Sequence, residues 1–248
     1  LVETRWYRYL INFVIMGSNA LVLSVLLGGT IVGACQALEL HRVGVLQWLR
    51  VDPWWNVGLT VVMLDGVTYW WHRAYHGVPV MWRMHRVHHS DRDVDVTTSG
   101  RFHLTEMVLS AAFRLGVLTL WGPVVGGVVI FEIVFGLLNQ VEHSNLQLPT
   151  RLEPWVRLFF VTPAMHRVHH SQIPEHTNSN YGTIFSWWDR LGRTYRMVDD
   201  QRALTLGLPD YPRSADVTFG KVLTMPFGPS CQEARALRSS GPMLSPSS

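Results

Sequence analysis

Histidine is the residue type in this chain whose number and spacing point most directly to chemistry. Twelve of the 248 residues are histidine, and most of them fall in short clusters. An identical heptapeptide, MHRVHHS, occurs at residues 84–90 and again at 165–171. Neutral imidazole is a ligand for zinc, copper, iron and nickel, so the clusters predict a metal site. The candidate ligands are His72, His76, His85, His88, His89, His143, His166, His169 and His170.

The spacing within each cluster suits metal binding from a helix. His72 and His76 are i and i+4, so both rings project from the same helical face. In each HxxHH segment the first two histidines are i and i+3 and the third is adjacent, which lets three ring nitrogens reach neighbouring metal positions. This number of imidazoles exceeds what one tetrahedral or octahedral ion can bind. We therefore predict two metal ions.

Polar residues at helical spacing from these histidines are candidates for the groups that orient them. Asp65 shares a predicted helix stripe with His72, and Glu132 and Asn139 share another with His143. A ligating histidine usually donates its second ring N–H to a carboxylate or carbonyl, and an ionisable group inside a membrane span is a functional candidate by default. Asn139 stands where an HxxxH motif would have its first histidine, so it can approach a metal directly or through water. The alternative is that Asp65 and Glu132 only satisfy buried polar groups between helices.

The three remaining histidines are weaker candidates. His103 precedes Glu106 at the start of the third predicted span, and we interpret it as a polar support near the site, with a ligand role as the alternative. His176 falls in a predicted loop, where a supporting or surface position is expected. His41 falls on the far side of the membrane in the topology below and is not expected to be a ligand.

Long uncharged segments indicate that the chain crosses a membrane. Hydrophobic residues make up 48% of the sequence and charged residues only 16%, against about 25% charged in ordinary soluble domains. The segments 10–34, 53–71 and 104–142 are each long enough to span, and the last divides into two at Gly122-Pro123. A cleavable signal peptide is the alternative for the first segment. A buried core helix is the alternative for the third span, which contains Glu106 and Arg114.

Four crossings return both termini and all candidate ligands to one membrane face. Most Arg residues flank that face, whereas the opposite loop, 35–52, carries only Arg42 and Arg50, so the positive-inside rule makes it cytoplasmic. We expect Leu152–Pro163 to be a short amphipathic helix on the membrane surface. A net charge of +3 is too small to suggest nucleic-acid binding. Cys35 and Cys231 lack the spacing of a metal or redox pair.

The ordered histidine segments HRAYH, HRVHH and HRVHH beside membrane spans resemble those of the fatty acid hydroxylase superfamily, also called the sterol desaturase family. Further matches are Arg101-Phe-His103 with Glu106, Glu142-His143-Ser-Asn145, Val161-Thr-Pro163, Asn180-Tyr-Gly182 and Trp188-Asp-Arg-Leu191, within residues 60–196. The nearest likeness is to the bacterial sterol-desaturase-like and alkylglycerol-monooxygenase-like branch. The chain departs from the pattern at Gly192-Arg193-Thr194, where the family usually has Phe-Gly-Thr.

The resemblance implies an all-α integral membrane protein of about four transmembrane helices, with a cytoplasmic helical cap that carries the histidine-rich dimetal site. Residues 1–196 would form this membrane domain, and residues 197–248 a polar, partly disordered C-terminal extension. The nine histidines would hold two iron ions, with zinc as a substitute in isolated protein. Residues expected to support them are Asp65, His103, Glu106, Asn139 and Asn180.

Members of the family use O2 and an electron donor to hydroxylate or desaturate lipid C–H bonds. The resemblance therefore implies an oxidoreductase in the bacterial inner membrane, with a lipid substrate and a redox partner such as a cytochrome b5-like protein, a ferredoxin or a reductase. No flavin, haem or nicotinamide fingerprint appears in the sequence. The competing hypothesis is a membrane protein that binds or transports metal ions, but a transporter would place its ligands near the bilayer midplane. Sequence patterns do not separate hydroxylation, ether cleavage and desaturation.

Overall fold

The computed structural model describes residues 5–27 and 29–228, and within these residues the fold is helical with only two isolated β-bridges. The four longest helices are α1 (Arg5–Leu27), α4 (Pro53–Gly77), α6 (Leu104–Trp121) and α7 (Val125–His143). Two shorter helices connect α1 to α4, namely α2 (Thr30–Leu40) and α3 (Val45–Trp48). The remaining helices are α5 (Pro79–His89), α8 (Glu153–Phe159), α9 (Pro163–His169), α10 (Pro174–Thr177), α11 (Trp187–Leu191) and α12 (Phe219–Thr224).

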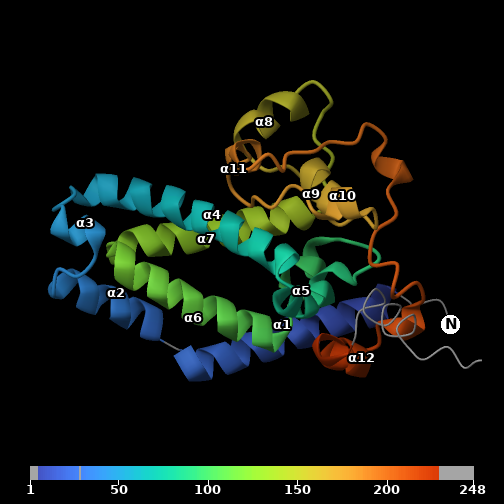
Figure 1. Ribbon diagram of the computed structural model, residues 1–248, viewed down its shortest axis with the longest axis horizontal. Coiled ribbons are helices and arrows are strands. Elements are labelled where there is room, and N and C mark those ends of the chain that lie inside the picture. Colours follow the sequence, from blue (N-terminus) through green and yellow to red (C-terminus); the bar gives the residue numbers. More distant parts are fainter. Residues whose placement is uncertain (1–4, 28, 229–248) are drawn as a thin grey trace, which may run out of the picture.

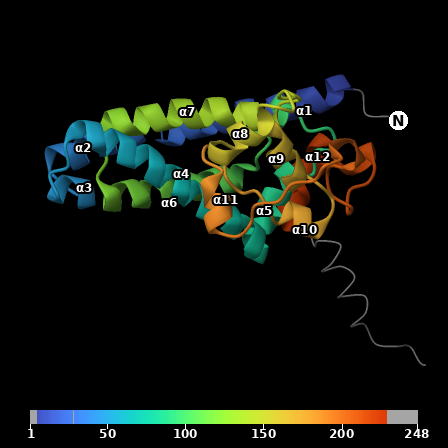
Figure 2. The same cartoon turned by 90° about the horizontal axis from the view of Figure 1, so that it is seen from above.

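The long helices run along the longest axis of the molecule (Figure 1), and α2 and α3 lie at one end of them. The short helices α5, α8, α9 and α10 gather toward the opposite end, and both views agree on this separation (Figure 2). Among the described residues, three helical segments are long and apolar enough to cross a membrane: Arg5–Val25, Leu104–Trp121 and Val125–His143. The architecture is that of an all-helical membrane protein.

The first predicted span, 10–34, differs from the structure. Helix α1 starts at Arg5 and ends at Leu27, and a separate helix, α2, begins at Thr30 after Gly29, which has φ of 73°. Glycine enters this left-handed region without the steric cost of a Cβ atom, so the continuous apolar run does not form one helix. The span therefore lies nearer the N-terminus than hydropathy alone placed it.

The second predicted span, 53–71, lies within α4, which is not one of the three candidates by composition. Polar residues account for this: Asn56, Thr60 and Asp65 are all buried along the helix. The Asn56 side chain accepts from Thr60 Oγ1 and from the backbone N–H of Val124, so α4 is fastened to the start of α7 by hydrogen bonds. The expected count of four spans therefore remains a proposal.

The predicted break at Gly122-Pro123 is present. Helix α6 ends at Trp121, and Gly122 adopts φ of 69° before α7 begins. A Cβ atom on Gly122 would lie 2.3 Å from the carbonyl oxygen of Val43, so the close approach of the α2–α3 connection also requires glycine. The turn reverses the chain, so that α7 runs antiparallel to α6 (Figure 1).

Two buried clusters hold the helices together. One contains Leu64, Leu118 and Phe131 of the three long helices around the site. The other packs Val222 and Met225 against Ile11 of α1, so the part of residues 197–228 around α12 belongs to the core. The rest of the predicted C-terminal extension, residues 229–248, lies outside the described residues.

A buried polar network joins α1 to the first histidine segment. Arg101 donates to the Val87 carbonyl, to Asn12 Oδ1 and to Ser90 Oγ. Arg8 forms an ion pair with Asp91 at 3.0 Å. Because these partners directly follow or belong to α5, the network fixes the orientation of α5.

The predicted amphipathic helix at 152–163 is represented by α8, which spans only Glu153–Phe159. Trp155 and Phe159 are largely exposed on it. Phe160 is extended and Pro163 begins α9, which shortens the helix. Its position on a membrane surface stays a prediction.

Candidate dimetal centre

The nine predicted ligands lie on helices α4, α5, α7 and α9, except for His170, which directly follows α9. Helix α4 bears His72 and His76 in its last turns, and α7 ends at His143. Helices α5 and α9 both have a proline in the first turn, a position where its fixed φ favours helix initiation. Each heptapeptide then places its histidines at the end of a short helix. These ends meet at the side of the molecule away from α2 and α3 (Figure 1).

The structure brings the nine side chains into two separate groups. Within each group, the potential ligand atoms all lie within 4.8 Å of one another. The first group contains His72, His76, His85, His89 and His169, and the second contains His88, His143, His166 and His170.

Each heptapeptide contributes to both groups. His85 and His89 are i and i+4, so they share a face of α5 and a group, while His88 points into the other group. The second copy does the reverse: His166 and His170 belong to one group and His169 to the other. The first and third histidines of HxxHH thus belong to one group, and the second belongs to the neighbouring group. The repeated sequence produces two interlocked sites.

Backbone carbonyl groups fix the ring orientation of three histidines. Nδ1 of His72 donates to the Tyr181 carbonyl at 2.9 Å, Nδ1 of His143 to the Asn139 carbonyl at 2.7 Å, and Nδ1 of His169 to the Ser179 carbonyl at 2.7 Å. A carbonyl oxygen can only accept, so Nδ1 carries the hydrogen in each ring. In the neutral ring, Nε2 then presents a lone pair.

These lone pairs face other lone pairs. His72 Nε2 lies 3.1 Å from His85 Nε2, while Nδ1 of His85 lies 2.7 Å from Glu106 Oε1. When Glu106 is ionised, both Nδ1 atoms donate and neither Nε2 has a hydrogen to share. Two neutral rings in this arrangement repel, and a cation held by both nitrogens removes the repulsion.

The second group shows the same convergence. His143 Nε2 lies 3.1 Å from His88 Nε2 and 2.9 Å from His166 Nε2, and His166 Nε2 lies 3.1 Å from His170 Nε2. Two nitrogens that bind one ion at about 2.0–2.1 Å and at right angles to each other would be about 3 Å apart. The observed separations fit adjacent ligands on a shared ion.

Burial keeps these rings in the form that binds metal. Burial lowers the pKa values of His85, His88 and His89 on α5 well below 6.5, and neighbouring imidazoles lower them further. The same causes act on the three histidines of the second heptapeptide. Several buried ring nitrogens have no hydrogen-bond partner among the described residues, including His89 Nε2 and His169 Nε2. Because an unpaired buried polar atom is costly, a neutral imidazole cluster of this kind fits metal ions.

Two of the predicted supporting residues contact a ligand. Glu106 is buried and bonds to His85 through its carboxylate, as described above. Asn139 supports His143 through its backbone carbonyl, whereas its side-chain amide donates to the Ser99 carbonyl at 3.3 Å. The position of Asn139, four residues before His143, therefore matters because its backbone carbonyl reaches the His143 ring.

Asp65 and Asn180 hold the polypeptide around the site instead of touching the nine rings. The Asp65 carboxylate accepts from the backbone N–H groups of Ile184 and Phe185 and from Trp188 Nε1, at 2.9–3.1 Å. Asp65 and His72 are separated by seven residues, about 10 Å along a helix, so a direct bond to that ring is out of reach. Asn180 Nδ2 donates to the carbonyl of Met165 on α9.

The other three histidines lie outside both groups. Nδ1 of His103 accepts from the backbone N–H of Thr105 at the start of α6, and Nε2 lies 3.1 Å from the Leu223 carbonyl. His176 lies beside Ser171 Oγ. His41 is exposed at the end of α2, at the opposite end of the long helices.

Glu142 is the polar neighbour whose role the helical spacing did not reveal. It is buried, with one carboxylate oxygen 3.8 Å from His143 Nδ1 and the other 3.7 Å from His166 Nδ1. The signal available was its adjacency to His143 in the segment Glu-His-Ser-Asn. The backbone carbonyls of Ser179 and Tyr181, which orient two of the rings, could not be recognised from the sequence, because every residue has a carbonyl.

An apolar cavity of about 280 Å³ ends at the metal-binding groups. Its walls come from α4, α6 and α7, and Trp71 stacks on Phe113 in the wall at a ring-centroid distance of 3.8 Å. Residues lining its inner end include His72, His85, His88, His143 and His166. The candidate metal site is thus open to an apolar chain that lies between the helices.

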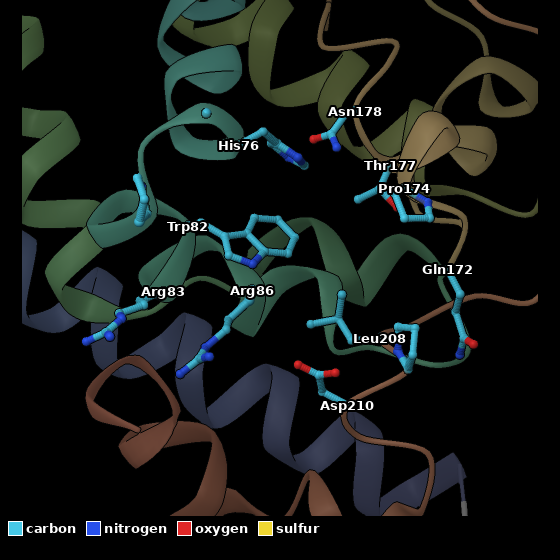
Figure 3. Close-up of a pocket in the computed structure, with 13 residues that line it drawn as sticks. His76, Trp82, Arg83, Arg86, Gln172, Pro174, Thr177, Asn178, Leu208 and Asp210 are labelled. Atoms are coloured by element: carbon cyan, nitrogen blue, oxygen red, sulfur yellow. The ribbon is translucent and has the colours of Figure 1, made fainter. Parts of the chain in front are cut away.

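A second pocket, of about 400 Å³, reaches the first group from another direction. Figure 3 shows His76 and Asn178 at one end of this pocket and Asp210 at the other, with the ring of Trp82 between them. The Trp82 ring centroid is 4.9 Å from that of His76 and 5.4 Å from that of His89. Its lining is more polar than that of the apolar cavity, because arginine, aspartate, asparagine and glutamine make up a larger share of its residues.

Fold and site together define a helical membrane protein with two groups of closely spaced histidines that could each hold a metal ion, and an apolar cavity leading to them. A family model for fatty acid hydroxylase matches residues 57–194, more than half of the chain and all nine histidines. The chain belongs to the fatty acid hydroxylase family.

Curated relatives carry lipid-modifying names. The chain is 33% identical to an alkylglycerol monooxygenase from Xenopus tropicalis over 68% of its length, covering 35% of that protein. It is 31% identical to the ornithine lipid hydroxylase OlsE of Rhizobium tropici over 63% of its length, covering 47% of that protein. A cholesterol 25-hydroxylase from Rattus norvegicus is 24% identical, with 61% and 50% covered. The chain spans half or less of the length of these relatives, and no solved structure matches it.

The departure from the family pattern at residues 192–194 has a local structural explanation. A Cβ atom on Gly192 would lie 1.8 Å from the hydroxyl oxygen of Tyr69, so a larger residue has no room there. Arg193 adopts φ of 57°, the left-handed region that the usual glycine would enter freely. Thr194 keeps its contacts, bonding to Asp189 Oδ1 and to the Tyr69 hydroxyl. The turn is retained at the expense of some backbone strain.

Proposed function

We propose that this chain is a membrane-bound, O2-dependent di-iron oxidoreductase that hydroxylates or desaturates a C–H bond of a lipid. The observation that carries the proposal is the placement of two buried imidazole groups at the inner end of an apolar cavity. Neither feature alone would suffice, because imidazole clusters also serve structural metals. The names of the relatives support a lipid substrate.

The two irons would be held by the two histidine groups described above. When bound, they supply the activation of O2 that allows hydrogen to be removed from an unactivated C–H bond. The chain holds the ring orientation through the Ser179, Tyr181 and Asn139 carbonyls and through Glu106. The cavity walls align the lipid chain and exclude water from the reacting carbon.

Hydroxylation places one oxygen atom of O2 in the lipid and reduces the other to water, so an electron pair and two protons must come from a donor. We propose a separate redox partner, approaching on the side of the polar pocket that contains Trp82. This side is separate from the lipid cavity, because the pocket reaches His76 without sharing the apolar lining. Four membrane crossings with the centre at the cytoplasmic face remain part of the proposal.

The experiment that tests this function compares the lipids of cells with and without the protein by mass spectrometry. A lipid that gains an oxygen atom indicates hydroxylation, and one that loses two hydrogens indicates desaturation. The variants His88→Ala and His169→Ala remove one ligand from each group and should abolish the product. His41→Ala is the matched control, since His41 is exposed at the opposite end of the long helices, and should behave as wild type.

Metal analysis of the purified protein provides the second arm. Fully loaded protein should contain about two ions per chain, and each ligand variant should contain fewer. Saturation of wild-type protein at one ion per chain would contradict the binuclear assignment. If the His169→Ala variant keeps full activity and both ions, the second heptapeptide is not part of the centre.

A further inference from the structure

Two charged side chains inside α6 and α7 contact none of the nine histidines. Besides His143, helices α6 and α7 contain four acidic or basic residues. Glu106 and Glu142 lie at the histidine end of these helices and contact ligands. Arg114 and Glu132 lie further along, eight and ten residues away, and form an ion pair with each other. At 1.5 Å per helical residue, Arg114 stands about 12 Å from Glu106 along the axis.

Arg114 is one of the residues that line the apolar cavity ending at the histidines. The guanidinium carbon of Arg114 lies 5.5 Å from the ring centroid of Phe131 and 5.8 Å from that of Phe135. Arginine has five N–H donors, and the acceptor recorded for it among the described residues is Glu132 Oε1. N–H groups of Arg114 thus remain for another partner.

A purely structural role explains this pair poorly. The side chains retain 25% and 42% of their exposed area, so the pair is incompletely enclosed by protein in a region of apolar side chains. Replacing a desolvated ion pair by apolar residues is often neutral or stabilising. Charged groups at this depth in a membrane protein generally serve function. The charge-balanced pair also has little net attraction for an anion.

We propose that Arg114 binds an uncharged oxygen atom of the lipid substrate, such as an ester carbonyl, ether or hydroxyl oxygen, and so sets which carbon reaches the metal centre. The proposal rests on the proposed function, because it names the substrate class of the same cavity. A carbon chain advances about 1.2–1.3 Å per bond when its bonds are about 1.5 Å long. The 12 Å rise then places the oxidised carbon on the order of ten bonds from the bound oxygen.

The test uses Arg114→Met, which keeps an unbranched side chain and removes every donor. Binding is measured to metal-free protein in detergent, with a long-chain alkylglycerol ether, a fatty acid and an alkane of equal length as the three probes. We expect the variant to lose about tenfold or more in affinity for the ether lipid, as on removal of one hydrogen bond from a charged donor. Affinity for the alkane should be unchanged. Arg202→Met, which removes an exposed arginine outside this cavity, is the control for charge.

The double variant Arg114→Leu/Glu132→Leu separates binding from structure. We expect it to fold with wild-type thermal stability while showing the same selective loss for the ether lipid. Equal losses for all three probes, or no loss for any, would overturn the proposal, and so would a selective loss for the fatty acid alone.

The second readout is the position of oxidation in metal-loaded protein. Wild type should oxidise one position, and Arg114→Met should give a mixture of neighbouring positions. A single unchanged position in the variant would overturn the proposal. If wild-type protein oxidises no lipid at all, the proposed function fails, whereas the binding experiment still decides the role of Arg114.

Discussion

Replacing Glu106 by glutamine should weaken metal binding through the first histidine group while leaving a measurable centre. Glu106 is buried, and its carboxylate lies 2.7 Å from Nδ1 of His85. A hydrogen bond to a charged group contributes about 1.5–3 kcal/mol, against about 1 kcal/mol for a neutral one. The difference, about 0.5–2 kcal/mol, corresponds to a loss of metal affinity of about 2- to 30-fold at 1.4 kcal/mol per factor of ten.

A larger loss is expected for Glu106→Ala. His85 Nδ1 then lacks its partner, and losses of about 10- to 100-fold in affinity or activity are typical when a residue that orients a ligand is removed. The control for metal binding is Glu132→Gln, which makes the same chemical change as Glu106→Gln. Glu132 pairs with Arg114 and lies outside both histidine groups.

The assay is metal retention against a graded series of chelator concentrations, followed by metal analysis of the protein. Lipid oxidation at matched protein concentration provides the kinetic counterpart, since metal loss also affects folding. If Glu106→Ala retains metal as tightly as wild type and Glu132→Gln, the carboxylate does not orient His85 as a ligand. The lone-pair reasoning for this group would then be refuted.

Three further predictions follow from the same structure. Burial and neighbouring imidazoles lower the pKa values of the histidines on α5 and in the second heptapeptide. Below pH 6.5 the unfolded chain therefore binds more protons than the metal-free folded protein, so thermal stability should fall as the pH drops from 7.5 to 5. A stability that is constant over this interval would contradict the neutral-ring assignment. Arg193→Gly should raise the free energy of unfolding by about 1 kcal/mol, because glycine adopts the left-handed conformation without strain. Gly192→Ala should lower the free energy of unfolding, because the added Cβ atom would clash with the Tyr69 hydroxyl. Chemical denaturation measures both changes, and unchanged values would mean that the turn relaxes. Topology reporters fused after residues 45, 95, 122 and 200 should read outside, inside, outside and inside, and an outside signal at 95 or 200 would exclude a shared cytoplasmic centre.

The sequence was sufficient to predict a histidine-rich metal site because the information was local. Ligand type is a property of each histidine, and the spacing of His72 and His76 is a property of one helix. The two copies of MHRVHHS, the turn at Gly122 and the long apolar segments could also be recognised without any tertiary contact. Family membership, shown by the match over residues 57–194, rests on the same linear patterns.

Only the tertiary structure decided how the histidines are divided between two groups. Helical spacing could not show that His169 joins His72 while its neighbour His170 joins His143, because that choice depends on how α9 docks against α4 and α7. The same limit explains Asp65: its phase on α4 was correct, but its partners, the backbone N–H groups of residues 184 and 185, come from far along the chain.

The carbonyl oxygens of Tyr181 and Ser179 are the clearest instance of this division. Every residue has a carbonyl, so no sequence pattern can mark the one that fixes a ring. Likewise, Arg114 and Glu132 were visible as isolated charges in apolar helices, yet their pairing and the position of Arg114 on the cavity wall depend on how α6 and α7 are arranged around the cavity. Side-chain chemistry is encoded one residue at a time, whereas its direction and surroundings are set by long-range packing.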